Sequence, residues 1–190
     1  MLILASTSVY RRELLARLQI PFEVVAPDVD ETPIHGESPP ATALRLAEAK
    51  AKAGGALRPG ALVLGSDQVA EIDGVRLGKP GGRDRAREQL LLASGRDVVF
   101  HTAVSLFLGE RGRTESSLVP TRVRFRSLSA SDVDRYLDKE QPYDCAGSAK
   151  SEGLGISLLE EISCSDPTAL IGLPLIAVAD LLRKAGLRVP

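Results

Sequence analysis

The sequence predicts an α/β fold with a mixed central sheet flanked by helices. Strand-like and helix-like segments alternate along its 190 residues, which is typical of this class. A hydrophobic content of 44% and a charged content of 26% are those of a globular protein, and this length can bury a substantial core. We therefore expect one domain over residues 1–190, without an internal repeat or an interdomain linker.

The chain opens with an apolar strand over residues 1–5, a Ser-Thr-Ser turn and a helix expected over residues 11–18. The N–H groups and the dipole of a helix N-terminus attract anions, and Arg11 and Arg12 add guanidinium groups suited to phosphate oxygens. The segment predicts an anion site, and a polyphosphate is the natural candidate. The alternative is a serine such as Ser8 that only caps the helix, beside arginines that lie in solvent.

The later elements are predicted from the periodicity of apolar residues and from the glycines and prolines at the ends of helices and strands. We expect strands over residues 22–26, 61–64 and 97–108, through 121–125 and through 156–158, and a hairpin-like return over 73–77. Helices are expected to begin near residues 38, 83 and 174, and one follows a capping box that starts at Ser129. The helix that begins near residue 38 is expected to end at Gly54-Gly55.

Three arginines alternate with other residues in the strand through 121–125. A period of two places Arg122, Arg124 and Arg126 on one sheet face. A solvated face explains them, and a face that borders a phosphate cleft is the alternative, so their role stays open.

Asp67 follows the apolar run 61–64 within the segment Gly-Ser-Asp-Gln. This order places Asp67 at the carboxyl end of a buried strand, where open α/β sheets build their sites. A carboxylate there can ligate Mg²⁺ or accept a proton from an attacking water. An aspartate that only caps the next turn is the alternative.

Two lysines and a second carboxylate extend this candidate site. Lys50 lies in the Ala-rich helix, Lys79 stands between a glycine and a proline, and Glu31 lies in an acidic loop. Each by itself is explained by a solvated charge. Together with Asp67 they suit a nucleoside triphosphate and its metal, because cations neutralise phosphate oxygens and carboxylates hold Mg²⁺. The chain has no P-loop, no dinucleotide-binding glycine loop and no nucleophile elbow.

Composition argues against several other classes. A net charge of −1 gives no basic field for nucleic acid, and no apolar run approaches the roughly 20 residues that span a bilayer. No secretory leader is recognisable, so we expect a cytoplasmic protein without a membrane partner. Cys145 and Cys164 form no metal-binding spacing, and buried reduced thiols are expected.

In combination, the motifs resemble the Maf family of nucleoside triphosphate pyrophosphatases. In chain order they are Leu4-Ala5-Ser6-Thr7-Ser8-x-x-Arg11-Arg12, Asp30-Glu31-Thr32, Leu46-Ala47-x-x-Lys50-Ala51, Gly65-Ser66-Asp67, Gly78-Lys79-Pro80 and Gly172-Leu173-Pro174. The resemblance implies an inosine-triphosphate-pyrophosphatase-like fold with two lobes around a cleft. It also implies cleavage between the α and β phosphates with a divalent cation (Mg²⁺, or Mn²⁺ or Co²⁺), and a homodimer as candidate assembly.

The resemblance assigns roles to matching positions of this chain. Asp67 is implied to be the catalytic acid–base residue, and Asp67 and Glu31 are implied to hold the metal. The phosphate-binding residues that it implies are Ser8, Arg12, Lys50 and Lys79.

Three further positions resemble the branch of the family that prefers 7-methyl-GTP. That branch has an aromatic residue before the arginine pair, a Gln after the catalytic Asp and the Glu of a Ser-Glu-Gly segment, matching Tyr10, Gln68 and Glu152. Methylation at N7 gives guanine a positive charge, which favours an aromatic face by about 0.5–2 kcal/mol. Glu152 is a candidate acceptor for the guanine N1–H and N2–H₂ groups, and Gln68 is a further donor or acceptor.

This chain departs from the pattern at two positions. Val9 stands where family members often have proline, and Tyr10 stands where tryptophan, the stronger cation–π partner, is familiar. The resulting expectation is removal of non-canonical nucleotides by hydrolysis of 7-methyl-GTP. A dTTP/UTP pyrophosphatase of the same family is the first alternative, and a nucleotide-binding cell-division regulator without turnover is the second.

Overall fold

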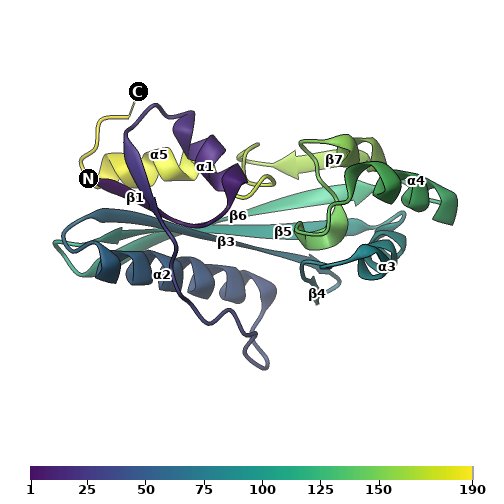
Figure 1. The fold of residues 1–190 in the computed structure, drawn as a ribbon, viewed down its shortest axis with the longest axis horizontal. Helices are drawn as coiled ribbons and strands as arrows, with labels where there is room; N and C mark the ends of the chain where they lie inside the picture. The colour runs from purple at the N-terminus through teal and green to yellow at the C-terminus, as the bar shows by residue number, and fades with distance from the viewer. Residues whose placement is uncertain (190) are drawn as a thin grey trace. The chain divides into compact units, whose positions relative to one another are not determined.

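The computed structural model describes residues 1–189, in which strands and helices alternate as the sequence predicts (Figure 1). The elements are β1 (Leu2–Ala5), α1 (Val9–Ala16), β2 (Phe22–Val25), α2 (Pro39–Leu57), β3 (Leu62–Ile72), β4 (Val75–Leu77), α3 (Arg83–Ala93), β5 (Asp97–Leu108), β6 (Arg113–Phe125), α4 (Ala130–Glu140), η1 (Ala146–Ser148), η2 (Leu154–Leu158), β7 (Leu159–Cys164) and α5 (Leu175–Lys184). The predicted α/β class is confirmed.

Within residues 1–189, the strands form one mixed sheet in the order β2-β1-β3-β5-β6-β7, and β4 pairs with β3. β1 is parallel to both of its neighbours, so Leu2–Ala5 lies opposite Phe22–Val25 on one side and Leu62–Gly65 on the other. The pairs β3–β4 and β6–β7 are antiparallel. The expected hairpin-like return after β3 is confirmed.

The expectation that Asp67 ends a short strand is wrong. β3 runs over Leu62–Ile72, and Asp67 lies inside it. β1, however, ends opposite Gly65, so Asp67 lies just beyond the point where β3 loses this parallel partner. Its side chain is therefore placed where a site of an open α/β sheet is expected, although the strand itself continues.

The chain divides into two compact units. The first contains residues 1–68, 102–119 and 166–189, and the second contains residues 69–101 and 120–165. Both units are discontinuous in sequence.

In the first unit, helices cover both faces of the strands. One face packs Leu4 and Leu64 against α1 and α5, with Leu14, Leu15 and Leu182 fully or almost fully buried. The opposite face, with Ile3, Ala5 and Val63, lies against α2. Figure 1 shows α1 and α5 on one side of β1 and β3 and α2 on the other. The first unit is therefore a three-layer α/β/α sandwich.

The prediction that α2 ends at Gly54-Gly55 is wrong, because α2 continues through both glycines to Leu57. A Cβ at Gly54 would lie 2.7 Å from Val63 Cγ1 and 2.8 Å from Ala5 Cβ. A Cβ at Gly55 would overlap the ring of Phe107. The two glycines thus allow α2 to approach the sheet closely, and this packing outweighs their cost of about 1 kcal/mol each in a helix.

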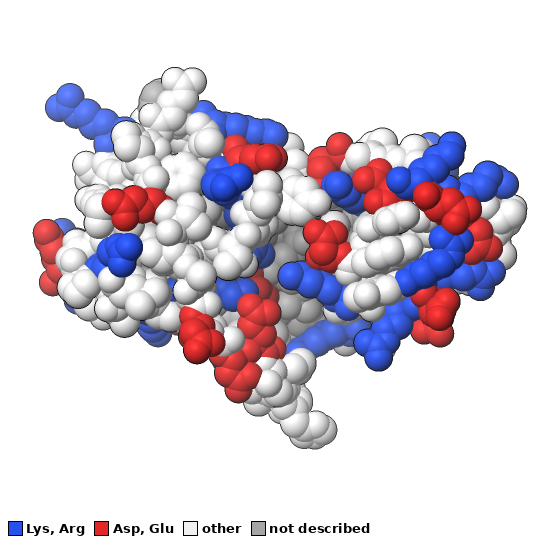
Figure 2. Space-filling view, viewed as in Figure 1, with Lys and Arg blue, Asp and Glu red and all other residues white. Residues whose placement is uncertain are grey.

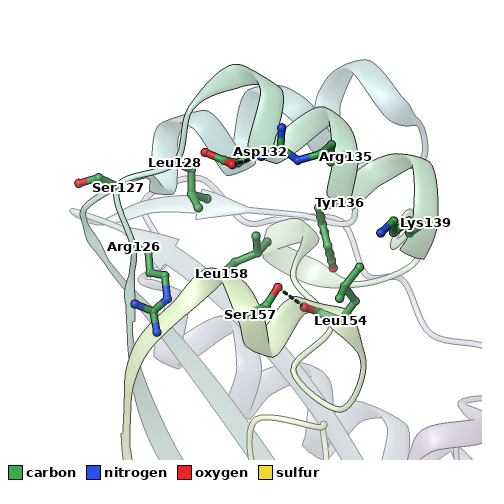
Figure 3. Close-up of a pocket in the computed structure, with 10 residues that line it drawn as sticks. All are labelled: Arg126, Ser127, Leu128, Asp132, Arg135, Tyr136, Lys139, Leu154, Ser157 and Leu158. Carbon is green, nitrogen blue, oxygen red and sulfur yellow. Dashed lines mark hydrogen bonds and ion pairs between the residues drawn. The ribbon is translucent and has the colours of Figure 1, made fainter.

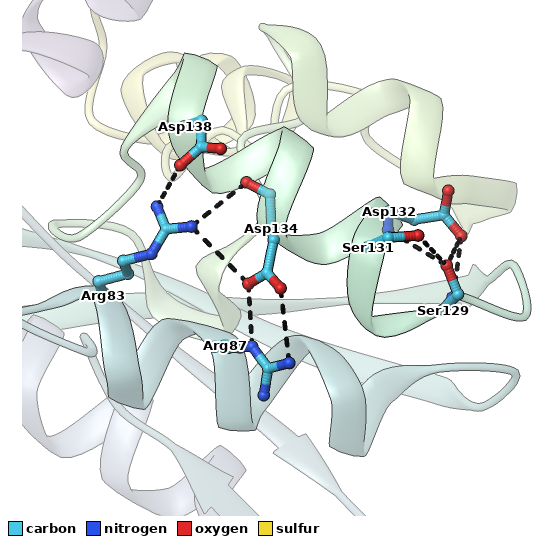
Figure 4. Close-up of polar contacts among 7 residues, drawn as sticks. All are labelled: Arg83, Arg87, Ser129, Ser131, Asp132, Asp134 and Asp138. Atoms are coloured by element: carbon cyan, nitrogen blue, oxygen red, sulfur yellow. Dashed lines mark hydrogen bonds and ion pairs between the residues drawn. The ribbon is translucent and has the colours of Figure 1, made fainter.

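The second unit joins α3 and α4 through ion pairs on neighbouring turns (Figure 4). Arg83 Nη1 lies 2.7 Å from Asp138 Oδ1, and Arg87 Nε donates to Asp134 Oδ1 at 2.9 Å. The N-terminus of α4 carries the predicted capping box, in which Ser129 and Asp132 each accept from the backbone of the other.

Three other expectations fall in the second unit. The expected strand through residues 156–158 is wrong, because these residues form the 3₁₀ turn η2 and β7 begins at Leu159. Both cysteines are free, as expected, but Cys164 is exposed and Cys145 is only half-buried. Arg122 and Arg124 both pair with Asp97, which supports the solvated sheet face over a phosphate cleft.

Among residues 1–189, no helix combines the length and apolarity needed to cross a membrane.

Candidate active site

Lys50 joins the two predicted carboxylates of the first unit. Its Nζ lies 2.7 Å from Asp67 Oδ1 and 2.6 Å from Glu31 Oε1. Lys50 and Asp67 are buried, each with 8% of its surface exposed, whereas Glu31 is exposed. Asp67 Oδ2 accepts no hydrogen bond from any residue in the described range 1–189. The structure thus brings together three residues from a loop, a helix and a strand, and leaves one oxygen of Asp67 available for chemistry.

The close approach of α2 to β3 positions Lys50. A Cβ on Gly65 would overlap the carbonyl oxygen of Ala47 and the backbone nitrogen of Ala51. Only glycine therefore permits this distance between the strand and the helix turn that carries Lys50. The same approach buries the stem of Lys50 while its ammonium reaches the two carboxylates.

The loop that carries Glu31 is attached to α2. Glu37 accepts two hydrogen bonds from Arg45, at 2.7 and 2.9 Å, and one from Thr42 Oγ1 at 2.7 Å. Nearer to Glu31, Thr32 N donates to Asp30 Oδ1 at 2.9 Å, and the hydrogen bonds from Thr32 lower the pKa of Asp30. These contacts hold an otherwise irregular segment in place, so the position of Glu31 beside Lys50 has a structural cause.

At the N-terminus of α1, Ser8 caps the helix and is also placed to bind an anion. Ser8 is the N-cap residue, and its Oγ accepts from Arg11 N at 3.4 Å. This contact is the capping alternative, and it leaves the Ser8 hydroxyl proton available to a ligand. Arg12 is exposed. Tyr10 is half-buried on the first turn of the same helix.

Arg11, which the sequence analysis places beside Arg12 at the predicted anion site but to which the family resemblance gives no role, is the more buried of the two arginines. Its Nε donates to Gly172 O at 2.9 Å. Burial lowers the pKa of Arg11, while the charges of Asp67 and Glu31 act to raise it. These interactions place Arg11 close to both carboxylates. A signal was present in the sequence, because Leu14 and Leu15, three and four positions later, put Arg11 on the buried side of the helix.

Gln68, next to Asp67, is held by its side-chain amide. Gln68 Nε2 donates to Thr102 Oγ1 at 2.9 Å and to the carbonyl oxygens of Ala169 and Leu170 at 3.0 Å each. Only the nitrogen end of an amide can donate to the two carbonyl oxygens, so these carbonyls fix the orientation of the side chain.

These contacts converge on the segment 166–172, which we call the carbonyl loop. Its backbone carbonyls accept from Arg11, Ser66, Gln68 and Thr102. Asp166, 2% exposed, holds the loop against α5: Oδ1 accepts from Thr168 N at 3.1 Å, and Oδ2 accepts from Ile176 N at 2.7 Å. No local pattern in the sequence connects Asp166 with the site.

The two remaining predicted residues belong to the second unit. Lys79 is exposed after β4, where Gln89 Nε2 donates to Gly78 O at 2.9 Å. Glu152 is exposed in the turn before η2, and Ser151 Oγ donates to its Oε2 at 3.4 Å. Both are accessible to a ligand, and neither has the buried partners that Lys50 and Asp67 have.

The second unit also contains a hollow of about 390 Å³, shown in Figure 3. Arg126 and Lys139 lie on opposite sides of it, and Leu154 and Leu158 lie between them. None of the predicted substrate or metal residues lines this hollow. On the face that Figure 2 shows, acidic and basic side chains are interspersed, in keeping with the net charge of −1.

The donor set of Glu31 and Asp67 fits a hard divalent cation, which prefers oxygen ligands. Within residues 1–189, no group of three or more His, Cys, Asp or Glu side chains is arranged to hold a metal. Two carboxylates alone suit Mg²⁺, because this ion keeps several waters and takes further ligands from substrate phosphates.

An α/β sheet with a lysine-bridged carboxylate pair and a basic helix N-terminus suits a protein that binds and hydrolyses a phosphorylated substrate. The model of the family described as Maf-like protein matches residues 1–185. The chain therefore belongs to the Maf family, and the resemblance found in the sequence is confirmed.

Relatives match over nearly the whole chain. A protein of Nitrosospira multiformis named 7-methyl-GTP pyrophosphatase is 55% identical, with 99% of this chain and 95% of the relative covered. Proteins with the same name from Burkholderia pseudomallei strain 1710b and Cupriavidus metallidurans are 60% and 58% identical. They cover 97% of this chain, and the matches span 87% and 93% of the relatives.

Proposed function

We propose that this protein is a nucleoside triphosphate pyrophosphatase that hydrolyses 7-methyl-GTP to 7-methyl-GMP and pyrophosphate. The observation that carries the proposal is the Lys50–Asp67–Glu31 cluster, in which a buried carboxylate beside a buried ammonium keeps one oxygen available. The names of relatives at 55–60% identity support the substrate. Such an activity would remove a non-canonical nucleotide from the cellular pool.

Each residue of the cluster has a role in this reaction. Asp67 orients a water molecule through Oδ2 and takes its proton as the water attacks phosphorus. Lys50 holds Oδ1 of Asp67 by its hydrogen bond and adds positive charge beside the reacting phosphates. Arg11, Arg12 and the hydroxyl of Ser8 bind phosphate oxygens from the helix N-terminus, and Lys79 is the further phosphate-binding cation that the family resemblance implies.

Glu31 and Asp67 are the residues that would hold a divalent cation. When bound, the cation supplies Lewis-acid polarisation of the phosphates and neutralises charge on the leaving pyrophosphate. Mg²⁺ is the expected ion, and Mn²⁺ or Co²⁺ could replace it, because all three accept carboxylate and phosphate oxygens. Chelation with EDTA should abolish turnover, and titration with Mg²⁺ should restore it; full activity in EDTA would contradict this role.

Base recognition is proposed for Tyr10, Gln68 and Glu152. The tyrosine ring would stack on the positively charged 7-methylguanine, and the carboxylate of Glu152 would accept from its N1–H and N2–H₂ edge. If Tyr10→Ala leaves the preference for 7-methyl-GTP over GTP unchanged, the stacking role is wrong.

The experiment that tests the proposal measures pyrophosphate release from 7-methyl-GTP, GTP, dTTP, UTP, CTP and ITP with Mg²⁺. Selective turnover of 7-methyl-GTP is expected, and Asp67→Asn should lower kcat by about 10²–10⁴-fold, the usual effect of losing a general base. Preference for dTTP or UTP would overturn the substrate but keep the chemistry. Tight binding without turnover, in Mg²⁺, Mn²⁺ and Co²⁺ alike, would favour the regulator.

The proposal also covers the cellular location, the partners and the assembly of the enzyme. A nucleotide substrate suggests the cytoplasm, and the net charge of −1 suggests no nucleic-acid partner. The family resemblance suggests a homodimer. Cell fractionation and light scattering of the purified protein test the location and the assembly.

A further inference from the structure

The side-chain amide of Gln68 has used its donors inside the protein. Nε2 carries two hydrogens and faces three acceptors: Thr102 Oγ1 at 2.9 Å, and the carbonyl oxygens of Ala169 and Leu170 at 3.0 Å. The other end of the amide, Oε1, accepts no hydrogen bond from any described residue, and the side chain is half-buried. Gln68 therefore offers an incoming ligand an acceptor and no donor.

Thr102 supports this orientation through its hydroxyl group. Its Oγ1 donates to Ala169 O at 2.9 Å, and Thr102 is completely buried. With the proton committed to this carbonyl, the hydroxyl oxygen accepts from Gln68. If the amide were reversed, Oε1 would face two carbonyls that cannot donate to it, and Thr102 could donate to it only by giving up the hydrogen bond to Ala169 O. That arrangement would leave buried acceptors unsatisfied.

We propose that Thr102 is a positioning residue for substrate specificity, which together with the two carbonyls holds Gln68 so that it contacts the nucleotide base as a hydrogen-bond acceptor. The inference rests on the proposed function and deepens it by fixing the polarity of the contact. A base that presents an N–H to Gln68 Oε1 is bound well, as guanine and 7-methylguanine do through the N2 hydrogen that the carboxylate of Glu152 does not use. A base that presents a ring acceptor at the same place, as cytosine does through N3, is disfavoured.

Two substitutions of the buried Thr102 distinguish the effect of its hydroxyl group from the effect of its packing. Thr102→Val keeps the shape and removes the hydroxyl, while Thr102→Ser keeps the hydroxyl and removes a methyl group. We expect Thr102→Val to raise KM for 7-methyl-GTP about two- to tenfold, the range of one neutral hydrogen bond, with kcat changed less than twofold. Thr102→Ser should retain the wild-type KM. Equal KM values in the two variants, or a larger defect in Thr102→Ser, would overturn the proposal.

A double-mutant cycle tests whether Thr102 acts through Gln68. In a Gln68→Met background the amide is gone, so Thr102→Val should raise KM no further. A second, independent rise would show that Thr102 acts by another route and would overturn the proposal. Inhibition by pyrophosphate, which carries no base, should have the same constant in wild type and Thr102→Val. A weakened pyrophosphate constant would likewise overturn it, because the whole site would then be disturbed.

The design distinguishes failure of this inference from failure of the proposed function. If wild type prefers a nucleotide other than 7-methyl-GTP, the proposed substrate is wrong, and the Thr102 variants are compared on the preferred nucleotide. If wild type hydrolyses none, dissociation constants for the same nucleotides replace KM. In either case a Val defect that Ser lacks and that disappears in Gln68→Met supports the role of Thr102, and its absence refutes it.

Discussion

Replacing Lys50 by methionine tests the central ion pair of the site. The Lys50 and Asp67 side chains are 10% and 11% exposed, and their charged atoms lie 2.7 Å apart. Lys50→Met keeps the length of the side chain but leaves the Asp67 carboxylate buried without its cation. Breaking such a pair from one side costs about 3–5 kcal/mol. The second contact, to Glu31, adds little because the Glu31 side chain is 59% exposed.

Urea unfolding followed by circular dichroism measures this cost. With a slope near 2 kcal/mol per molar urea, the midpoint should fall by roughly 2 M. The matched control is Lys52→Met on the same helix: the Lys52 side chain is 57% exposed and its Nζ lies 3.4 Å from Glu48, so its loss should cost less than about 0.5 kcal/mol.

The double variant Lys50→Met, Asp67→Asn decides the cause of the effect. If the cost arises from the unpaired carboxylate, the double variant recovers stability relative to Lys50→Met, with a coupling energy of at least about 2 kcal/mol. A loss below 1 kcal/mol in Lys50→Met, or strictly additive losses, would refute the reasoning from buried charge.

Four further outcomes are expected. Gly65→Ala would push β3 away from the carbonyl of Ala47, so the free energy of unfolding in urea should fall by about 2 kcal/mol or more, and kcat should fall as well. Unchanged values would show that α2 can move away from the added methyl group. Asp166→Asn should cost about 1–3 kcal/mol in the same assay, because backbone N–H groups at the α5 N-terminus lose their acceptor. Ser129→Ala should cost about 1 kcal/mol and leave pyrophosphate release unchanged, since it removes only the cap of α4. Burial raises the pKa of Tyr136 to about 12, so ultraviolet titration should show one tyrosine that ionises at higher pH than the others. The free energy of unfolding should decline between about pH 10 and 12, because the unfolded state loses this proton there and the folded state keeps it. Three tyrosines that titrate together near pH 10 would contradict the burial.

The sequence allowed good prediction wherever local signals agreed with the tertiary structure. The alternation of strands and helices, the strand over residues 97–108 and the capping box at Ser129 are all present. Lys50 and Asp67 were selected for their chemistry, and their contact follows from the parallel arrangement of β1 and β3 beneath α2. The binding or catalytic roles of the predicted site residues stay predictions, because contacts within the protein do not test them. These residues are Ser8, Tyr10, Arg12, Glu31, Lys50, Asp67, Gln68, Lys79 and Glu152.

The failures have a common physical cause, which is packing between segments far apart in the chain. Gly54 and Gly55 have the local signature of a helix end, yet α2 continues because the sheet and Phe107 occupy the space of a side chain. Arg11 and Thr102 act through carbonyls near residue 170, a connection that no local window contains. Residue spacing reports the near neighbours of a side chain, whereas these contacts depend on the whole fold.

The hydrogen bond from Arg11 to Gly172 joins residues 161 positions apart in the chain. Ser66 donates to the same carbonyl across 106 positions. At about 5–20 residues per second, Gly172 is therefore synthesised roughly 8–30 seconds after Arg11. An incomplete nascent chain that ends before this loop lacks the acceptor of both side chains. The arrangement of Arg11 and Ser66 in the site therefore depends on a segment that is made more than 100 residues later.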